Sequence, residues 1–156
     1  MLSKSRYCLF TQCPRALWLR VNRPELATPD SSVESRMEKG NEIGDLAMQL
    51  FGDFVEVTSA DEKGKLDLSE MITRTNTLLL EHTPVICEAS FSYNGCYCAV
   101  DILKRENGGY AIYEVKSSTH ANEIYATDIA YQKYVLEHCG VNVTGTYLVC
   151  LNNEYV

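Results

Sequence analysis

The chain has 156 residues, 46% of them apolar and 22% charged, and its formal net charge is −7. That composition excludes a predominantly disordered chain and fits one globular domain with a hydrophobic core. The first ten residues contain no apolar segment typical of a signal peptide, and no run approaches the ~18 apolar residues that cross a bilayer, so we expect no membrane partner. The seven cysteines lack the spacing of a secreted scaffold and favour free thiols in a reducing cytoplasm.

Positive charge is concentrated near the N-terminus. The first 23 residues contain no acidic side chain and five basic ones: Lys4, Arg6, Arg15, Arg20 and Arg23. The net negative charge argues against phosphate binding over the whole surface, but it leaves room for a local basic patch. The pattern fits such a patch and a solvated helix face equally well.

Four helices and a short strand are expected in the first half of the chain. Ser3 or Ser5 caps a first helix through "RYCLFTQC", and Pro14 opens a second in "PRALWLRV". After a loop at residues 23–32, "SVESRMEKGNEIGDLAMQLFG" repeats apolar residues at helical spacing and ends at Gly52. "FVEVTS" predicts a short strand, and Ser69 opens a further helix through "SEMITRTNTLLLEH".

The second half predicts three strands, a helix and a last strand. "PVICEASFSYNGCYCAVDILKRENGGYAIYEVKSS" holds three strand-like runs separated by Asn94-Gly95 and Asn107-Gly108, which are typical of tight hairpin turns. A helix follows in "ANEIYATDIAYQKYVLEHCG", stopped by Gly140, and then a strand from Val141 to about Leu151. We expect residues 1–156 to form a single α/β (α+β) domain. Because no closing element follows the last strand, we expect the N-terminal part of a longer protein, with a further domain as a candidate partner.

The two turns set the register of the three strands. If each Asn-Gly pair supplies the two central residues of its turn, Glu88 lies opposite Asp101, and Asp101 lies opposite Glu114. Three carboxylates then form one row across one face, with Lys116 two residues beyond Glu114. Like charges side by side repel, and a divalent cation such as Mg²⁺ or Mn²⁺ offsets that cost.

The second turn has an alternative. If Gly108-Gly109 forms it, Asp101 faces Lys116 in an ordinary cross-strand salt bridge. The letters "ENGG" permit either turn. The first hairpin places Glu88 in the same row and favours the metal site.

A row of this kind has the chemistry of metal-assisted phosphodiester hydrolysis. Asp101 and Glu114 would hold one or two Mg²⁺ or Mn²⁺ ions, with the Val115 carbonyl as a further ligand. The metal lowers the pKa of a water molecule and neutralises charge on the scissile phosphate. Lys116 would position the attacking water and stabilise the pentacovalent state, in an electrostatic role more than as a base, because the neighbouring carboxylates keep it charged.

The same residues resemble a known family. "VDIL", then "YEVKSS", then "AYQKYVLE" on the following helix is similar to the D…ExK…Q pattern of the PD-(D/E)XK nuclease superfamily, most closely its RecB-type branch. The opening "LSKSRYCLFTQCPRALWL" resembles the start of the CRISPR-associated adaptation exonucleases and their uncharacterised relatives. The resemblance spans nearly the whole chain and implies a restriction-endonuclease-like αβββαβ core with extra N-terminal helices.

The resemblance implies roles for individual residues of this chain, according to their positions in the motif. Asp101 and Glu114 match the metal ligands, Lys116 matches the catalytic lysine, and Glu88 matches the acid often found before the Asp strand. Gln132, together with Tyr134, falls where the branch has a Gln…Tyr motif that supports the site and the nucleic-acid strand. The basic Arg15 and Arg20 are candidate contacts to DNA.

Two positions depart from the family pattern. The branch usually has a histidine ligand on the first core helix, where "GNEIGDLA" has Gly44; Glu42 and Asp45 are the candidates to replace it. Tyr134 follows Gln132 by two residues, whereas the family spacing is four. These departures leave activity open.

One cysteine raises the question of an iron–sulfur cluster. Relatives with a "CPR" opening use that cysteine with three C-terminal ones to hold a [4Fe–4S] cluster, and Cys13 matches the first of the four. Cys139 and Cys150 are not spaced like the other three. We therefore expect no complete cluster in this chain as given, and we interpret Cys13 as a small buried residue.

Three functions remain as hypotheses. The leading one is a divalent-metal-dependent deoxyribonuclease domain, exonuclease-like in character. The second is a nucleic-acid-binding module that kept the nuclease fold and lost efficient cleavage. The third is a scaffold in which the charged residues merely pair.

Overall fold

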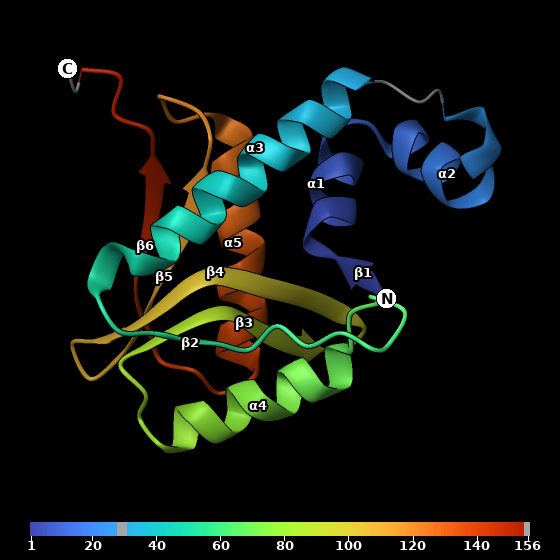
Figure 1. Ribbon diagram of the computed structural model, residues 1–156. Helices are drawn as coiled ribbons and strands as arrows, with labels where there is room; N and C mark the ends of the chain where they lie inside the picture. The colour runs from blue at the N-terminus through green and yellow to red at the C-terminus, as the bar shows by residue number, and fades with distance from the viewer. Residues whose placement is uncertain (28–30, 155–156) are drawn as a thin grey trace.

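Six strands form one mixed sheet, and helices cover both of its faces (Figure 1). The computed structural model describes residues 1–27 and 31–154, without the side chains of residues 31–37. The expected α/β class, a mixed sheet flanked by helices, is confirmed. Of the loop expected at residues 23–32, residues 28–30 lie outside the described residues. The prediction is wrong for Pro24–Leu26, which form a 3₁₀ turn, and for residues 31–32, which already belong to a helix. Among the described helices, none is long and apolar enough to cross a membrane.

The strands lie in the order β2-β3-β4-β5-β6, and β1 pairs with β4 outside that path. The pairs β3–β4 and β4–β5 are antiparallel, whereas β1–β4, β2–β3 and β5–β6 are parallel. The strands are β1 (Leu2–Ser3), β2 (Val55–Glu56), β3 (Val85–Tyr93), β4 (Cys96–Glu106), β5 (Gly109–Lys116) and β6 (Val143–Cys150). The sequence did not predict β1, because two residues are too short to show an alternating pattern.

The helices follow the predicted order, with one corrected start. Ser3 caps α1 by accepting the N–H of Arg6, as predicted. The fourth helix begins before Ser69, because the Asp67 carboxylate accepts the N–H groups of Ser69 and Glu70 at 3.1 and 3.0 Å. The helices are α1 (Lys4–Gln12), α2 (Pro14–Asn22), the 3₁₀ turn η1 (Pro24–Leu26), α3 (Ser31–Ala47), the 3₁₀ turn η2 (Met48–Phe51), α4 (Leu68–Leu80) and α5 (Glu123–His138).

Both hairpins use their Asn-Gly pair as the turn. Tyr93 pairs with Cys96 across the first turn, and Glu106 pairs with Gly109 across the second. The asparagine and the glycine of each turn have positive φ, which a type I′ turn requires at both central residues. The predicted register is therefore confirmed, and the Gly108-Gly109 alternative is wrong. Asparagine supplies the left-handed conformation at position 107, so the turn closes one residue earlier.

The sheet is irregular where the carboxylates lie. Residues two apart on a strand normally face the same side. Yet the pair Cys87–Ile102 packs in the small core under η2, while the pair Ala89–Val100 packs in the large core under the helices. Both strands thus change face at one step, between these pairs, at Glu88 and Asp101. Glu88 has φ 56°, a left-handed conformation that is uncommon for glutamate.

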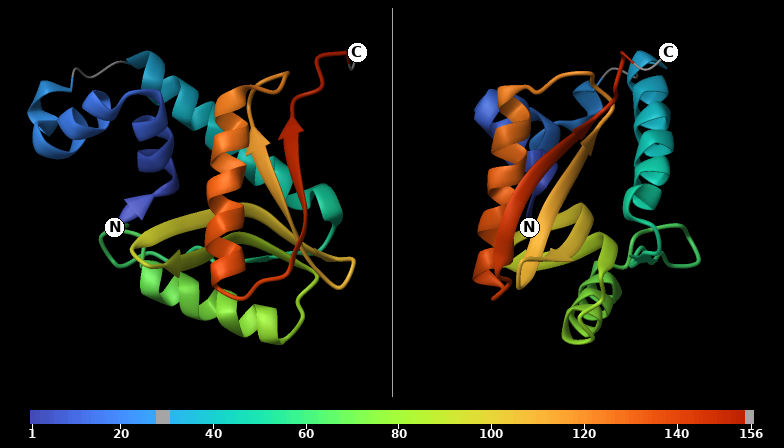
Figure 2. Two further views of the ribbon diagram at one scale, coloured as in Figure 1. Left: turned by 180° about the vertical axis from the view of Figure 1, so that it is seen from behind. Right: turned by 90° about the vertical axis from the view of Figure 1, so that its left-hand side faces the viewer.

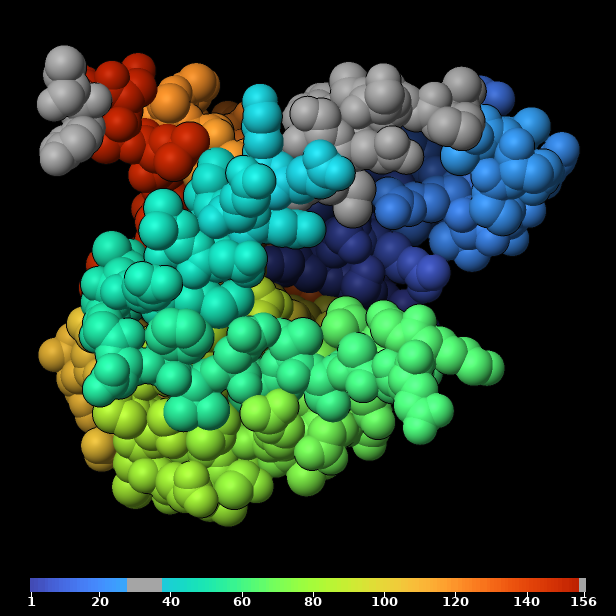
Figure 3. Space-filling view, in the orientation of Figure 1, coloured from blue at the N-terminus to red at the C-terminus, as the bar shows by residue number. Residues whose placement is uncertain are grey.

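Two layers of helices enclose the sheet. The large core joins the sheet to α4 and α5, through Met71 of α4 and Tyr131, Val135 and Leu136 of α5. The small core lies on the other face and includes Met48 of η2. The right-hand view of Figure 2 shows α5 and α3 on opposite sides of β5 and β6. On the face drawn in Figure 3, α1 is set back beside α3.

Candidate functional site

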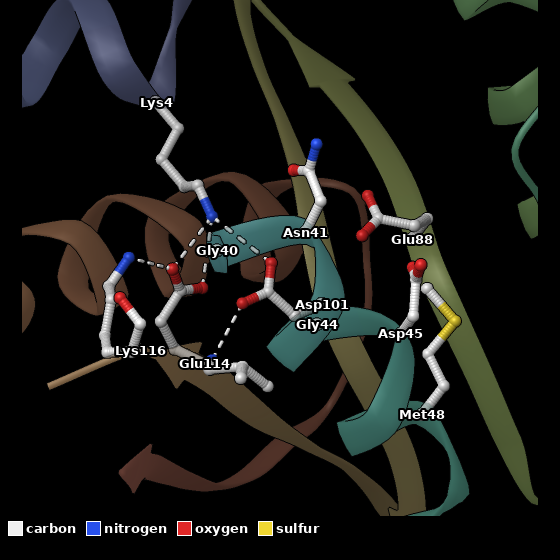
Figure 4. Close-up of a pocket in the computed structure, with 12 residues that line it drawn as sticks. Lys4, Gly40, Asn41, Gly44, Asp45, Met48, Glu88, Asp101, Glu114 and Lys116 are labelled. Carbon is white, nitrogen blue, oxygen red and sulfur yellow. Dashed lines mark hydrogen bonds and ion pairs between the residues drawn. The ribbon is translucent and has the colours of Figure 1, made fainter. Parts of the chain in front are cut away.

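A pocket of about 370 Å³ lies where β5 separates from β4, with α3 as its opposite wall (Figure 4). Six predicted metal-binding and catalytic positions line it: Asp45, Glu88, Asp101, Glu114, Val115 and Lys116. Register and fold thus bring these side chains together from α3 and three neighbouring strands. Glu42, the other candidate on α3, is exposed and lies outside the lining.

The fork between two strands creates this pocket. β5 pairs with β4 from Ile102 onward, and β1 pairs with the start of β4 at Cys96. Between these two pairings Asp101 has no partner in the strand ladder of β4 and β5, and its Oδ2 instead accepts the N–H of Val115 at 2.7 Å. A side-chain carboxylate therefore ties the two strands together at the fork, and this hydrogen bond leaves Oδ1 directed toward the pocket's charged groups.

Glu114 is the buried centre of the site, with a side chain only 1% exposed. It accepts hydrogen bonds from Lys4, from Lys116 and from Gln132, whose Nε2 is 2.6 Å away. Burial raises the pKa of the Glu114 carboxyl, and the two ammonium groups act in the opposite direction. All three partners are donors, which matches an ionised carboxylate.

Lys116 lies between two carboxylates. Its Nζ donates to Glu114 and, at 2.8 Å, to Oδ2 of Asp128 on α5. Burial alone lowers the pKa of Lys116, but these carboxylates outweigh it and raise the pKa above its ordinary value. Lys116 is therefore a stable cation in this arrangement, which suits an electrostatic role.

Asp128 was missed from the sequence. It lies on α5 four residues before Gln132, so the two side chains share one helix face, and Gln132 Nε2 donates to its Oδ1 at 3.0 Å. Burial raises the pKa of Asp128, but Lys4 and Lys116 outweigh it, so the net direction is down. The i, i+4 spacing with a glutamine already assigned to the site is the signal that identifies it.

Lys4 was also missed, since the sequence showed it only as part of the N-terminal basic run. Its Nζ donates to both oxygens of Glu114, at 3.0 and 3.1 Å, and lies 3.7 Å from carboxylate oxygens of Asp101 and Asp128. Burial lowers the pKa of Lys4, yet these three carboxylates outweigh it and hold the pKa well above its usual range. Figure 4 shows the side chain reaching down from α1 into the cluster.

Glu88 and Asp45 form the other side of the pocket. Burial, with the Asp101 charge next in importance, raises the pKa of Glu88 to about 7. Asp45 extends from α3 toward Glu88 (Figure 4). Gly44, where the resembled family has a histidine, also lines the pocket, and a Cβ built there meets no atom within 4 Å.

Five other predicted residues lie outside the pocket lining, and of these Gln132 contacts the site through its hydrogen bond to Glu114. Tyr134 is 45% exposed, and its ring packs on His138 at 4.2 Å. Arg15 and Arg20 are exposed on α2. The interpretation of Cys13 as a buried residue is wrong: it is exposed between α1 and α2, two helices that contribute no buried residue to the core.

The donor chemistry of the pocket fits a hard divalent cation. Carboxylate oxygens are the ligands that Mg²⁺ and Mn²⁺ prefer. Within residues 1–27 and 31–154, no three His, Cys, Asp or Glu side chains converge closely enough to share one ion as they stand. The ammonium of Lys4 lies among three of the carboxylates, so the cluster already accommodates a positive charge. Gln132 Oε1 is buried and has no hydrogen-bond partner among the described residues, so it can still accept a hydrogen bond.

Comparison with known proteins assigns no family. The sequence matches neither a model of a known protein family nor a curated protein. Any statement of function therefore rests on the residues and geometry of this chain.

Proposed function

We propose that this chain is a divalent-metal-dependent nuclease domain that hydrolyses DNA phosphodiester bonds, exonuclease-like in character. The fold that goes with this proposal is the restriction-endonuclease-like αβββαβ core of the RecB-type PD-(D/E)XK nucleases. The β3-β4-β5 meander, followed by α5 and a parallel β6, supports it. So does α3, which lies ahead of the meander and forms one wall of the pocket.

One observation carries the proposal. The two Asn-Gly turns set a register that gathers Glu88, Asp101 and Glu114 around one pocket, with Lys116 at its edge. A scaffold has no need for this arrangement, because burying several carboxylates together is costly. Hydrolysis of a phosphodiester needs carboxylates and a fixed positive charge at one place.

Asp101 and Glu114 are the residues that would hold Mg²⁺ or Mn²⁺, with Val115, Glu88 and Asp45 as further candidates. When bound, such an ion lowers the pKa of a water molecule and neutralises charge on the phosphate. Asp101 is fixed for this role by its hydrogen bond from Val115. Glu114 is held by Gln132, a buried amide that prevents its carboxylate from turning away.

Lys116 would act on the phosphate. Its ammonium lies at the pocket wall and is kept charged by Glu114 and Asp128. There it stabilises the extra negative charge of the pentacovalent state and orients the attacking water. Arg15 and Arg20 lie on α2, which has no acidic residue, and we assign them to contacts with the DNA backbone.

The test is DNA cleavage with Mg²⁺ or Mn²⁺ by the wild type and by Lys116→Ala. Lys104→Ala is the matched control, because Lys104 is also half-buried on the same sheet but pairs with Glu106 at 3.1 Å. We expect metal-dependent cleavage that is lost in Lys116→Ala and kept in Lys104→Ala. Cleavage that survives in Lys116→Ala, or that proceeds in EDTA, contradicts the proposal.

The second candidate is a nucleic-acid-binding module without efficient cleavage. Gly44 favours it, because this pocket position lacks the histidine that the resembled family uses as a ligand. Binding of DNA by the wild type with no cleavage under any divalent metal would select this candidate over the nuclease.

A further inference from the structure

The N-terminal segment places one particular side chain, Lys4, in the carboxylate cluster. Leu2 pairs with β4 and donates its N–H to the Gly95 carbonyl at 2.8 Å. The Leu2 carbonyl accepts the hydroxyl of Tyr131 at 2.6 Å, and Tyr131 also stacks on Tyr7 of α1. These contacts hold both sides of Lys4, so its entry into the pocket is built into the fold.

Lys4 neutralises negative charge that Lys116 alone does not balance. Asp101, Glu114 and Asp128 all lie within 3.7 Å of its Nζ. Lys116 contacts two of the three, Glu114 and Asp128. Without Lys4, Asp101 would have no cationic partner among the described side chains, and the carboxylates would repel one another in a poorly solvated place.

The same atoms are the ones a divalent ion needs. Lys4 donates one hydrogen bond to each oxygen of Glu114 and lies opposite Oδ1 of Asp101, the oxygen that Val115 leaves available. An ion bound by Asp101 and Glu114 would meet the ammonium at close range. Two cations do not share one set of carboxylate oxygens at that distance, so the occupants exclude each other.

We propose that Lys4 is a tethered counter-ion: it holds the carboxylate cluster together in the metal-free protein and is displaced when a divalent cation binds. This inference rests on the metal site of the proposed function. Metal binding then includes the cost of breaking the contacts of Lys4, so the affinity of the wild type for metal is lowered by its own N-terminal segment.

Removal of Lys4 should therefore tighten metal binding. We compare Mn²⁺ binding by isothermal titration to the wild type, to Lys4→Met, and to Lys104→Met as the control lysine of the same sheet. Lys4→Met is expected to bind about tenfold to a hundredfold more tightly, the range of one hydrogen bond between charged groups. Lys104→Met is expected to bind like the wild type.

A second measurement uses the wild-type protein and does not depend on the folding of a variant. Lysine acetylation by an N-hydroxysuccinimide ester is followed by peptide mass spectrometry with and without Mn²⁺. We expect Mn²⁺ to accelerate modification of Lys4, because the ammonium is released from its carboxylates, and to leave Lys104 unchanged.

The outcomes separate the inference from the proposed function. Mn²⁺ binding that is equal or weaker in Lys4→Met, or an unchanged Lys4 acetylation rate when Mn²⁺ is bound, overturns the inference and leaves the metal site standing. Absence of Mn²⁺ binding in both the wild type and Lys4→Met overturns both. If Lys4→Met does not fold, the acetylation result on the wild type decides.

Discussion

Glu88 should make the stability of the metal-free protein depend on pH. Its pKa is raised from 4.5 to about 7, by burial first and by the Asp101 charge second. A carboxyl whose folded pKa lies above its unfolded pKa stabilises the fold at low pH and loses that contribution as the pH rises through the folded value. The difference between these two pKa values corresponds to about 3.4 kcal/mol of folding free energy, of which about 2.5 kcal/mol is lost between pH 5 and pH 8.

The assay is urea unfolding in EDTA at both pH values, for the wild type and Glu88→Gln. Because other groups also titrate, the quantity of interest is the difference in the free energy of unfolding between the two proteins. We expect that difference to shift by about 2.5 kcal/mol in favour of Glu88→Gln at pH 8. Glu62→Gln, on the exposed loop after β2, is the control and should show no such shift. Parallel pH profiles for the wild type and Glu88→Gln would refute the reasoning.

Three further predictions concern the same site and the thiols. Asp128→Asn should lower kcat about 10- to 100-fold with little change in KM, because Asp128 positions Lys116; steady-state kinetics checks the split. Gly44→His should tighten Mn²⁺ binding about tenfold and Mg²⁺ binding less, since imidazole is the softer ligand and the position is open; isothermal titration compares the metals. Cys98, whose pKa burial raises to about 12, should resist a thiol reagent in the native protein that reacts with the exposed Cys13.

Local turn chemistry explains why so much of the sheet was predictable. An Asn-Gly pair determines the turn type and hence which residues face each other across a hairpin, so Glu88, Asp101 and Glu114 were placed without knowledge of the rest of the fold. Helix starts were predictable because a capping side chain is also a local signal. The exception is the fourth helix, where Asp67 is the cap and not Ser69.

The features that the sequence did not predict depend on long-range packing. Lys4 is 110 residues from Glu114 in the chain, and only the pairing of β1 with β4 brings it to the pocket. Asp128 needed the orientation of α5 against the sheet, although its spacing from Gln132 was a usable signal. Exposure of Cys13 depends on how α1 and α2 pack, which an apolar pattern alone does not determine.

The irregular step of the sheet argues for a functional site over a scaffold of paired charges. A scaffold built for stability would keep the alternation of β3 and β4 and avoid a left-handed glutamate, which costs about 1–3 kcal/mol. Here the change of face and the positive φ occur at Glu88 and Asp101, which line one pocket. The amide that holds Glu114 of the same pocket, Gln132, has an oxygen without a partner among the described residues. Asp101 does not form the simple salt bridge with Lys116 that a scaffold would use; it ties the strand fork instead. Local rules that fail together at one place are typical of sites maintained for binding or catalysis.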